Sequence, residues 1–379
     1  MERVLVCLLG ATRAHELTFP SFKRRVLDEL SGDLAMALTI DETYAYANPF
    51  WQHAKYRWTG PDFGDYGEGF DQVQRWLCQQ HKVPAPDWRS MLRLNGNWQG
   101  RIASQNPQFG NGAIEIFVRW LLLHGLQQDN ILDRYDRFVI TRSDFVWLAP
   151  HPPLSVLDKD AIWIPDGEKY SGLNTRHLVA SRADVADCLN LIEDIVLRPT
   201  RLYEEMKYLP VDSRYGWNME QFLQHHLCRK ERLRKVKLFP CVMYLARSVR
   251  DDGSKTWSRG RYEPAVGHFV KYEEEFHAAS TCAKIIHGRA DWESGVWRHS
   301  EAAARRPDSL EPHPGSPARR PASLPRRLRY ACERPYYEAY YRIRSALRQP
   351  GRFGRLGRFS KRLVRRTPKT SSSRLPRQS

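Results

Sequence analysis

Val4–Leu9 (VLVCLL) is a continuous apolar run that stops at Gly10. A run of this length without polar residues is typical of a strand buried on both faces in a parallel sheet. Residues 19–30 then repeat apolar side chains at helical spacing, and residues 34–40 form a second apolar run that ends at Asp41. These segments predict a β-α-β unit and an α/β fold built on a mostly parallel, mixed sheet flanked by helices.

Helical and strand patterns continue to alternate along the chain. A polar, aromatic and glycine-rich stretch at residues 45–69 is expected to be an irregular insertion. Ser181 and Asp184 predict a capped helix start. The further predicted elements are helices at 70–80, 113–126, 181–197 and after Trp217, and strands at 137–145, 161–164 and 239–245.

Polar residues follow several of the predicted strands. In an open α/β sheet the ligand site lies at the carboxyl ends of the strands. The loop 10–13, Asp41 and Asp144 each lie at the end of a predicted strand. We therefore expect these residues to lie together at one edge of the sheet.

The charge of the chain is concentrated near its C-terminus. The sequence of 379 residues has a formal net charge of +17, and from Glu301 onward Lys and Arg outnumber Asp and Glu by 21 to 5. Before Glu301 there are 39 basic and 38 acidic residues. The body is therefore close to neutral, and attraction to an anionic partner is expected to come from the tail.

The tail combines basic and apolar residues. Tyr336, Tyr340, Ile343 and Leu347 fall on one face of a helix, with arginines around it. Such a segment can place apolar groups at the headgroup boundary while its basic groups attract an anionic membrane surface, so we predict peripheral docking on the inner face of a membrane. A disordered tail without a partner is the first alternative, and nucleic-acid binding is the less favoured one.

The cysteine pattern favours a reducing compartment. The seven cysteines are scattered, without a C-x-x-C pair or a disulfide framework. The apolar run at the start is too short for a signal peptide, and no stretch reaches the length of about 18 apolar residues that a membrane span needs. We therefore expect a cytoplasmic protein.

Three stretches carry a resemblance to a known family. They are the first strand with residues 10–13 and 21–22 after it, TRSDFVW at 141–147, and YSGLNTRH at 170–177. Together they resemble the nucleotide-sugar-dependent glycosyltransferases of the GT-A type, especially a family related to the WavE lipopolysaccharide-synthesis proteins. The second stretch is similar to the R-x-D form of the family's acidic metal motif, and Asp144 is its one acid. The third resembles a segment in which a glycine pair precedes an Asn/Asp-Arg motif.

The resemblance covers about residues 3–287. It implies a GT-A-like (Rossmann-like) catalytic domain at 1–290, before a Pro/Arg-rich linker at 291–325 and the basic tail at 326–379. It also implies hexosyl transfer from a nucleotide-sugar donor to a cell-surface polysaccharide or a lipid-linked saccharide acceptor. The implied donor-binding residues are Gly10, Thr12, Arg13, Asp41, Arg142, Asn174 and Arg176.

The diphosphate of such a donor must have its leaving charge neutralised. A divalent cation on oxygen ligands can do this, and so can Arg or Lys at a strand end. Asp144 is the expected ligand for Mn²⁺ or Mg²⁺, and Arg142 offers the direct contact.

An inverting transfer also needs a carboxylate that takes the proton of the acceptor hydroxyl. Glu220, at the start of a predicted helix, and Asp166, in a predicted turn, are the candidate catalytic residues. An acid in the first turn of a helix is also common because of the helix dipole alone.

Other residues have weaker functional interpretations. His268 and His287 lie where related folds place a metal-binding histidine, although a single histidine is more often structural. The stretches 257–260 and 271–275 also look family-like, and a Lys or Arg in either can contact phosphate, although such charges more often lie on a solvated face. The alternative functions are a nucleic-acid-binding protein that acts through its tail, and a non-catalytic member of the transferase fold.

Overall fold

The computed structural model describes residues 2–41, 44, 46–209, 211, 216–249 and 259–288, with the side chains of the last two left aside. The linker, the tail and the His287 side chain therefore lie outside the described residues, and so do the predictions about the partners of the tail. Within the part described, no helix has both the length and the apolar character to cross a membrane. The six cysteines that the structure describes carry free thiols.

The centre of the fold is a seven-stranded sheet in the order β3-β2-β1-β4-β7-β6-β8. All its neighbouring strands pair in parallel except β7, which is antiparallel to both β4 and β6. The strands are β1 (Val4–Leu9), β2 (Asp33–Ile40), β3 (Tyr56–Pro61), β4 (Arg137–Thr141), β6 (Ile162–Pro165), β7 (Leu178–Ser181) and β8 (Val236–Phe239). The predicted α/β class with a mostly parallel mixed sheet is confirmed.

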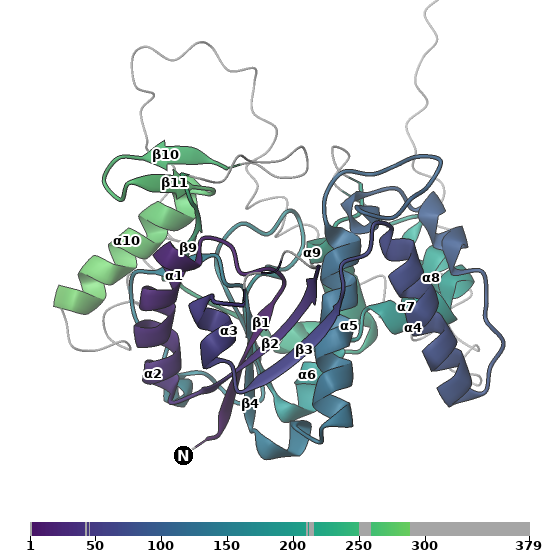
Figure 1. The fold of residues 1–379 in the computed structure, drawn as a ribbon, viewed down its shortest axis with the longest axis horizontal. Coiled ribbons are helices and arrows are strands. Elements are labelled where there is room, and N and C mark those ends of the chain that lie inside the picture. Colours follow the sequence, from purple (N-terminus) through teal and green to yellow (C-terminus); the bar gives the residue numbers. More distant parts are fainter. Residues whose placement is uncertain are drawn as a thin grey trace, which may run out of the picture. The chain divides into compact units, whose positions relative to one another are not determined.

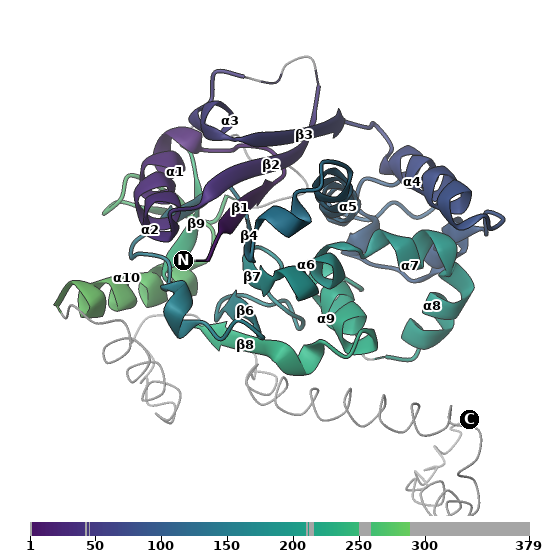
Figure 2. The same ribbon diagram turned by 90° about the horizontal axis from the view of Figure 1, so that it is seen from below.

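Helices cover both faces of this sheet (Figure 1; Figure 2). On one face a continuous helical segment, composed of α1 (His15–Phe22), the π-turn Lys23–Leu27 and α2 (Asp28–Leu30), buries its apolar side chains against alternate residues of β1 and β2. On the other face α5 (Gly112–Gln128) packs on β1, β2 and β3. Because both faces are covered at the centre of the sheet, β1 is apolar throughout and β2 nearly so, as the sequence of β1 indicated.

The remaining helices lie mainly beside α5 (Figure 2). α4 packs on α5 and α7, and α6 packs on β7. α9 starts with a capping box, in which Gln221 N donates to Asn218 Oδ1 at 2.9 Å and Asn218 N donates to Gln221 Oε1 at 3.3 Å. The bounds are α3 (Pro49–His53), α4 (Tyr66–His81), α6 (Arg182–Leu189), α7 (Ile192–Leu197), α8 (Pro199–Met206) and α9 (Met219–Arg229), with short 3₁₀ turns at Trp88–Arg93, Asn97–Gln99, Leu132–Arg134, Leu154–Val156 and Leu233–Lys235.

A second, four-stranded sheet has the order β10-β11-β9-β5. Its strands are β5 (Phe145–Trp147), β9 (Met243–Arg247), β10 (Arg261–Glu263) and β11 (His268–Val270), and α10 (Glu273–Gly288) packs on β9. Figure 1 shows this small sheet and α10 on the side of the large sheet where α1 lies. Phe145, Trp147, Met243 and Leu245 join the same core as β1 and α1, which fixes the small sheet to the large one.

Two predicted strands each divide between the two sheets. Residues 137–145 form β4 and then, after a turn at 142–144, the start of β5. Residues 239–245 contain the end of β8 and the start of β9, with Pro240 between them. Proline has no backbone donor and interrupts a sheet ladder, which accounts for the second break.

Other predicted elements also differ from the structure. The stretch 45–69 is not irregular, since it contains α3 and the edge strand β3, whose side chains are only half-buried or exposed. The helix at 181–197 divides into α6 and α7 at residues 190–191, and Ser181 also ends β7, a strand that was not predicted. The Ser181 hydroxyl donates to Asp184 at 3.0 Å and does not cap a backbone group.

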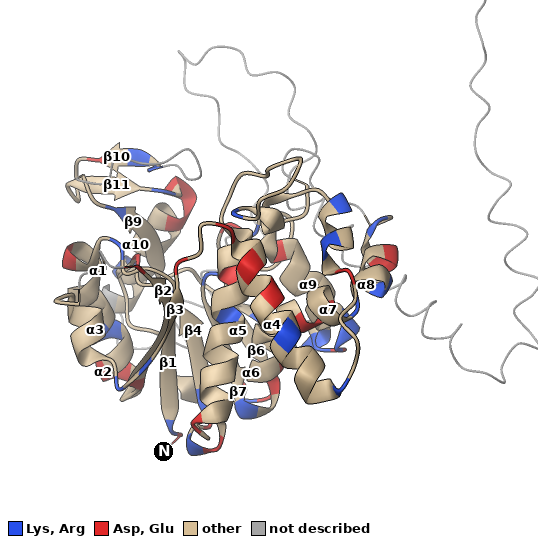
Figure 3. Ribbon diagram, turned by 45° about the vertical axis from the view of Figure 1, so that its right-hand side comes forward, with Lys and Arg blue, Asp and Glu red and all other residues tan. Residues whose placement is uncertain are grey.

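Charged residues of both signs are interspersed over the described part of the body. Figure 3 shows acidic and basic positions together on α4 and on α8. This agrees with the near balance of charge before Glu301.

Candidate functional site

The loops after β1 and β4 lie side by side, as the sequence predicted. The two strands are parallel neighbours, with Leu8 opposite Thr141. The Ser143 hydroxyl donates to Ala11 O at 2.9 Å, which joins the loop containing Gly10, Thr12 and Arg13 to the loop containing Arg142 and Asp144. Gly10 has a φ of 82°, a left-handed conformation that glycine adopts without strain.

Other candidate residues come to the same edge of the sheet. Asp41 follows β2 and is exposed, and Asp166 follows β6, which runs in the same direction. Because β7 is antiparallel to its neighbours, its first residue lies at this edge. Asn174 and Arg176, which precede β7, therefore lie here too. All the donor-binding candidates therefore follow or precede a strand at this one edge.

Asp144 is buried between two arginines. Its side chain is 2% exposed, and it accepts from Arg142 Nε and Nη2 at 3.0 and 2.8 Å and from Arg247 Nη1 at 2.7 Å. Burial opposes ionisation of this carboxyl, but the guanidinium groups of Arg142 and Arg247 outweigh it and hold its pKa below the usual range, with a smaller contribution from Arg13.

The surroundings of Asp144 do not fit a divalent cation. Both of its carboxylate oxygens already accept hydrogen bonds from guanidinium groups, so a cation there would replace these bonds and meet two positive charges. Among the described residues, no three histidine, cysteine or acidic side chains gather in one place, so a cation at Asp144 would depend on this one carboxylate and on the phosphates of a bound donor. The contacts of Asp144 therefore favour a role in orienting guanidinium groups over the expected role as a ligand for Mn²⁺ or Mg²⁺.

Asn174 and Arg176 hold the loop after β6 in place. Arg176 is 4% exposed and forms an ion pair with Glu275 of α10 at 2.6 Å. Its Nη2 also donates to Glu168 O at 2.7 Å, and its guanidinium lies 4.6 Å from the centroid of the Tyr272 ring. Asn174 Oδ1 accepts from Arg176 N at 3.0 Å. The charge of Arg176 is thus neutralised by Glu275, and the side chains of Asn174 and Arg176 fix the conformation of the segment after β6.

Glu220 is a buried carboxylate in the first turn of α9. Its side chain is 9% exposed, and Thr175 Oγ1 donates to it at 3.5 Å. Burial raises its pKa from 4.5 to about 7, and the nearby carboxylate of Glu115 adds to this effect. A carboxylate that changes protonation near neutral pH suits a general base.

Asp166 lies in a different environment. It is 48% exposed and pairs with Lys169 at 2.8 Å. Water and a lysine therefore stabilise its charge, whereas the protein interior destabilises that of Glu220. Of the two candidate bases, Glu220 has the environment that general-base catalysis requires.

His268 has a structural position in β11. Its Nε2 lies 2.9 Å from the Tyr244 hydroxyl, and the two rings stack. The described residues bring no further metal ligands to it. The metal-ligand interpretation of His268 is therefore not supported by its contacts.

Three charged residues complete the site although they were not among the predicted site residues. Arg247 ends β9, Lys271 follows β11, and Glu115 lies in the first turn of α5. Arg247 and Lys271 come from the small sheet, more than 100 residues after Asp144, and no local pattern connects them with it. The only sequence signal was the family-like stretch around Lys271.

Lys271 connects the two parts of the site electrostatically. It interacts with Arg142, Arg247 and Asp144, and it also stabilises the charged form of Glu220. The buried carboxylate with a raised pKa and the basic groups around Asp144 therefore belong to one site.

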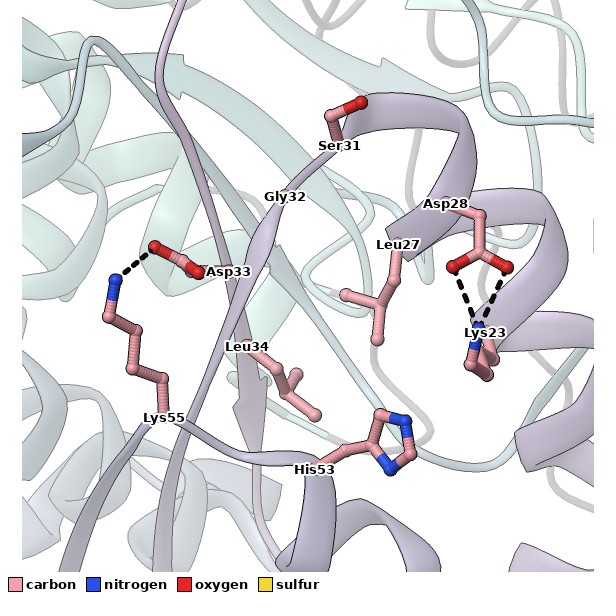
Figure 4. Close-up of a pocket in the computed structure, with 9 residues that line it drawn as sticks. All are labelled: Lys23, Leu27, Asp28, Ser31, Gly32, Asp33, Leu34, His53 and Lys55. Carbon is pink, nitrogen blue, oxygen red and sulfur yellow. Dashed lines mark hydrogen bonds and ion pairs between the residues drawn. The ribbon is translucent and has the colours of Figure 1, made fainter.

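A pocket of about 510 Å³ lies elsewhere, at the opposite edge of the sheet where β2 starts. Figure 4 shows Lys23 pointing to Asp28 on one side of this pocket and Lys55 pointing to Asp33 on the other, at 2.9 and 2.6 Å. Its lysines are thus charge-balanced, and it contains none of the candidate residues.

The comparisons with known proteins give a limited result. No protein-family model matches the sequence, and no curated protein matches it. Among solved structures, mouse xyloside xylosyltransferase 1 in its apo form is similar, with a TM-score of 0.32 and 10% identity over 64% of this chain and 86% of the mouse chain. Similarity at this level does not assign an activity, which has to be inferred from the side chains of the site. The narrower resemblance to WavE-related proteins finds no support here.

Proposed function

We propose that this protein is a glycosyltransferase that moves a sugar from a nucleotide-sugar donor to a cell-surface polysaccharide or lipid-linked saccharide. The observation that carries this proposal is that Glu220, a buried carboxylate with a raised pKa, contacts the segment before β7, at the sheet edge that also holds the basic groups around Asp144. Basic groups stabilise a leaving diphosphate, and such a carboxylate accepts a proton from a hydroxyl group.

In the proposed reaction the acceptor hydroxyl oxygen attacks the anomeric carbon of the donor sugar. The proton of this hydroxyl passes to the Glu220 carboxylate. The bond between the anomeric carbon and the phosphate oxygen breaks, and the nucleoside diphosphate leaves with the electron pair. This chemistry inverts the anomeric configuration, because nucleophile and leaving group occupy opposite faces of the sugar.

The residues at the sheet edge have distinct proposed roles. The loop with Gly10, Thr12 and Arg13 lines the nucleotide site, and Asp41 at the end of β2 can accept a hydrogen bond from a ribose hydroxyl. Arg142, which is 34% exposed, contacts the diphosphate, while Asp144 fixes the direction of its guanidinium. Asn174 and Arg176 position the loop that adjoins Glu220.

The test uses purified full-length protein and a panel of nucleotide sugars. Isothermal titration should show binding of at least one nucleotide sugar, and product analysis with saccharide acceptors should show transfer. Glu220→Gln should keep donor binding and lose turnover, because the amide has the shape of the acid but takes no proton. Absence of binding to every donor, in a protein shown to be folded, would contradict the proposal.

The nucleic-acid alternative concerns the tail, which lies outside the described residues. It predicts salt-sensitive binding to DNA or RNA by the full chain and no donor binding. The same titrations, repeated with an oligonucleotide at two salt concentrations, separate the two functions. Docking of the tail on anionic vesicles remains part of our proposal for where the enzyme acts.

A further inference from the structure

Lys271 is carried to the site by the small sheet. In the register of this sheet Phe145 lies opposite Leu245, and Lys271 N donates to Leu245 O at 3.0 Å. Residues opposite one another in a sheet share a face, and every second residue of a strand returns to it. Lys271 and Arg247 therefore project from the same face as Phe145, which packs in the main core.

The ammonium group of Lys271 has an unusual environment for a lysine. Among the residues that the structure describes it forms no ion pair and no hydrogen bond, and its contact is the Tyr272 ring, 5.1 Å from the centroid. Burial lowers its pKa to about 7, and the positive charges of Arg142 and Arg247 add to this effect. A bound anion would remove this electrostatic cost.

Several basic side chains of the described residues surround Asp144. Its single carboxylate pairs with both Arg142 and Arg247, and it also interacts with Arg13 and Lys271. By contrast, Arg176 pairs with Glu275. Basic groups are thus concentrated at the edge where β4 and the small sheet meet.

We propose that Lys271 and Arg142 together bind the diphosphate of the donor directly, without a divalent cation. This inference rests on the proposed function and adds to it the way in which the leaving group is held. Two neighbouring phosphates need two cationic groups, and the site offers a planar guanidinium beside a compact ammonium. Asp144 then acts as a positioning residue that directs the guanidinium groups.

Isothermal titration with inorganic pyrophosphate tests this proposal on the full-length protein, in EDTA and at about 0.15 M salt. Wild-type protein should bind pyrophosphate in EDTA, and added Mg²⁺ should not be required. Lys271→Met should weaken binding roughly ten- to hundredfold, the value of one hydrogen bond between charged groups. Lys271→Arg, which keeps the charge, should retain most of the affinity.

Lys55→Met is the matched control. Lys55 lies at the opposite edge of the sheet and pairs with Asp33, so its loss should leave the affinity unchanged. The wild type and all variants carry the same basic tail, so binding of pyrophosphate to the tail contributes equally to each titration. Thermal unfolding of each variant shows whether it is folded.

Binding that needs Mg²⁺, or a Lys271→Met variant with wild-type affinity, would overturn the proposal. The same variants titrated with nucleotide sugars separate it from the proposed function. Pyrophosphate binding through Lys271 without binding of any nucleotide sugar would support the anion site and contradict the transferase. Donor binding that is independent of Lys271 would support the transferase and contradict the anion site.

Discussion

Glu220 experiences two opposing influences. The first turn of α9 favours its negative charge through the helix dipole, whereas burial and Glu115 disfavour it. Burial is the stronger influence, because the pKa rises from 4.5 to about 7. The folded protein therefore binds a proton at Glu220 over a pH range in which the unfolded chain has released it.

A first prediction concerns stability and pH. Below pH 4.5 the Glu220 carboxyl makes its full contribution to the free energy of unfolding. As the pH rises to about 7 this contribution is lost, and the free energy of unfolding falls by about 3 kcal/mol. Glu220→Gln should remove this part of the pH dependence, so the variant should gain stability relative to wild type as the pH rises. Urea unfolding at several pH values measures the difference. If the free energy of unfolding depended on pH in the same way for wild type and Glu220→Gln, the Glu220 carboxyl would not be buried as described.

A second prediction concerns the affinity for the diphosphate and pH. Lys271 must be protonated to bind an anion, so affinity should fall as the pH rises above about 7, by at most about tenfold per pH unit for one proton. Turnover needs Glu220 deprotonated and should rise over the same range. Lys271→Arg stays charged, so its affinity should depend on pH only through Glu220. The charged groups that act on Lys271 are Arg142, Arg247, Asp144, Arg176 and Glu220.

A third prediction concerns the buried ion pairs of Asp144. Asp144→Ala removes the carboxylate that pairs with Arg247 at 2.7 Å, where Arg247 is 1% exposed. We expect a loss of about 3–5 kcal/mol in the free energy of unfolding, as for other broken buried pairs. Asp133→Ala is the control, because Asp133 is 89% exposed where it pairs with Arg182, and its loss should cost less than about 1 kcal/mol. Equal effects in chemical denaturation would argue against the buried cluster.

The loop after β6 contacts α9 closely at Gly172. A Cβ atom at this position would lie 2.2 Å from the carbonyl carbon of Glu220, so the loop or the helix must move to admit it. Leu173 N also donates to Glu220 O at 3.1 Å, which holds the two segments in register. Glycine is thus required here by the approach of two backbones.

A fourth prediction follows from this contact. Gly172→Ala should destabilise the fold by about 1–3 kcal/mol and reduce turnover up to about a hundredfold, because Glu220 is displaced from the acceptor. Gly64→Ala is the control, since a Cβ there meets no atom within 4 Å. The measurements are thermal unfolding and the rate of sugar transfer. Unchanged turnover in a folded Gly172→Ala variant would exclude Glu220 as the base.

Elements with strong local patterns were predicted from the sequence, and elements set by tertiary contacts were not. The first strand, α5 and α9 have continuous or periodic apolar residues, and these patterns alone define them. The half-buried edge strand β3 has no such pattern, because only one neighbour pairs with it. The divisions between β4 and β5 and between β8 and β9 depend on which sheet each segment joins, which a local pattern does not contain.

In the molecule as a whole, the candidate site is formed where two sheets meet. The large sheet supplies the loop 10–13, Asp41 and Asp144, which lie at the ends of predicted strands, because parallel strands end at one edge. The small sheet supplies Arg247 and Lys271, and its existence was not predicted. An acid at the end of a strand indicates a metal site when only the sequence is considered. The arginines that contact Asp144 come partly from the small sheet, and they disfavour that interpretation.

The reversed direction of β7 has a consequence for how such a site can change. The segment 166–177 leaves the sheet at the end of β6 and returns to it at the start of β7, at the same rim. Its two anchor points are therefore close together, and its length and composition can vary without any change in the register of the sheet. In the proposed transferase, exchange of this short segment would change the acceptor preference, while the surface proposed to bind the leaving group stays intact.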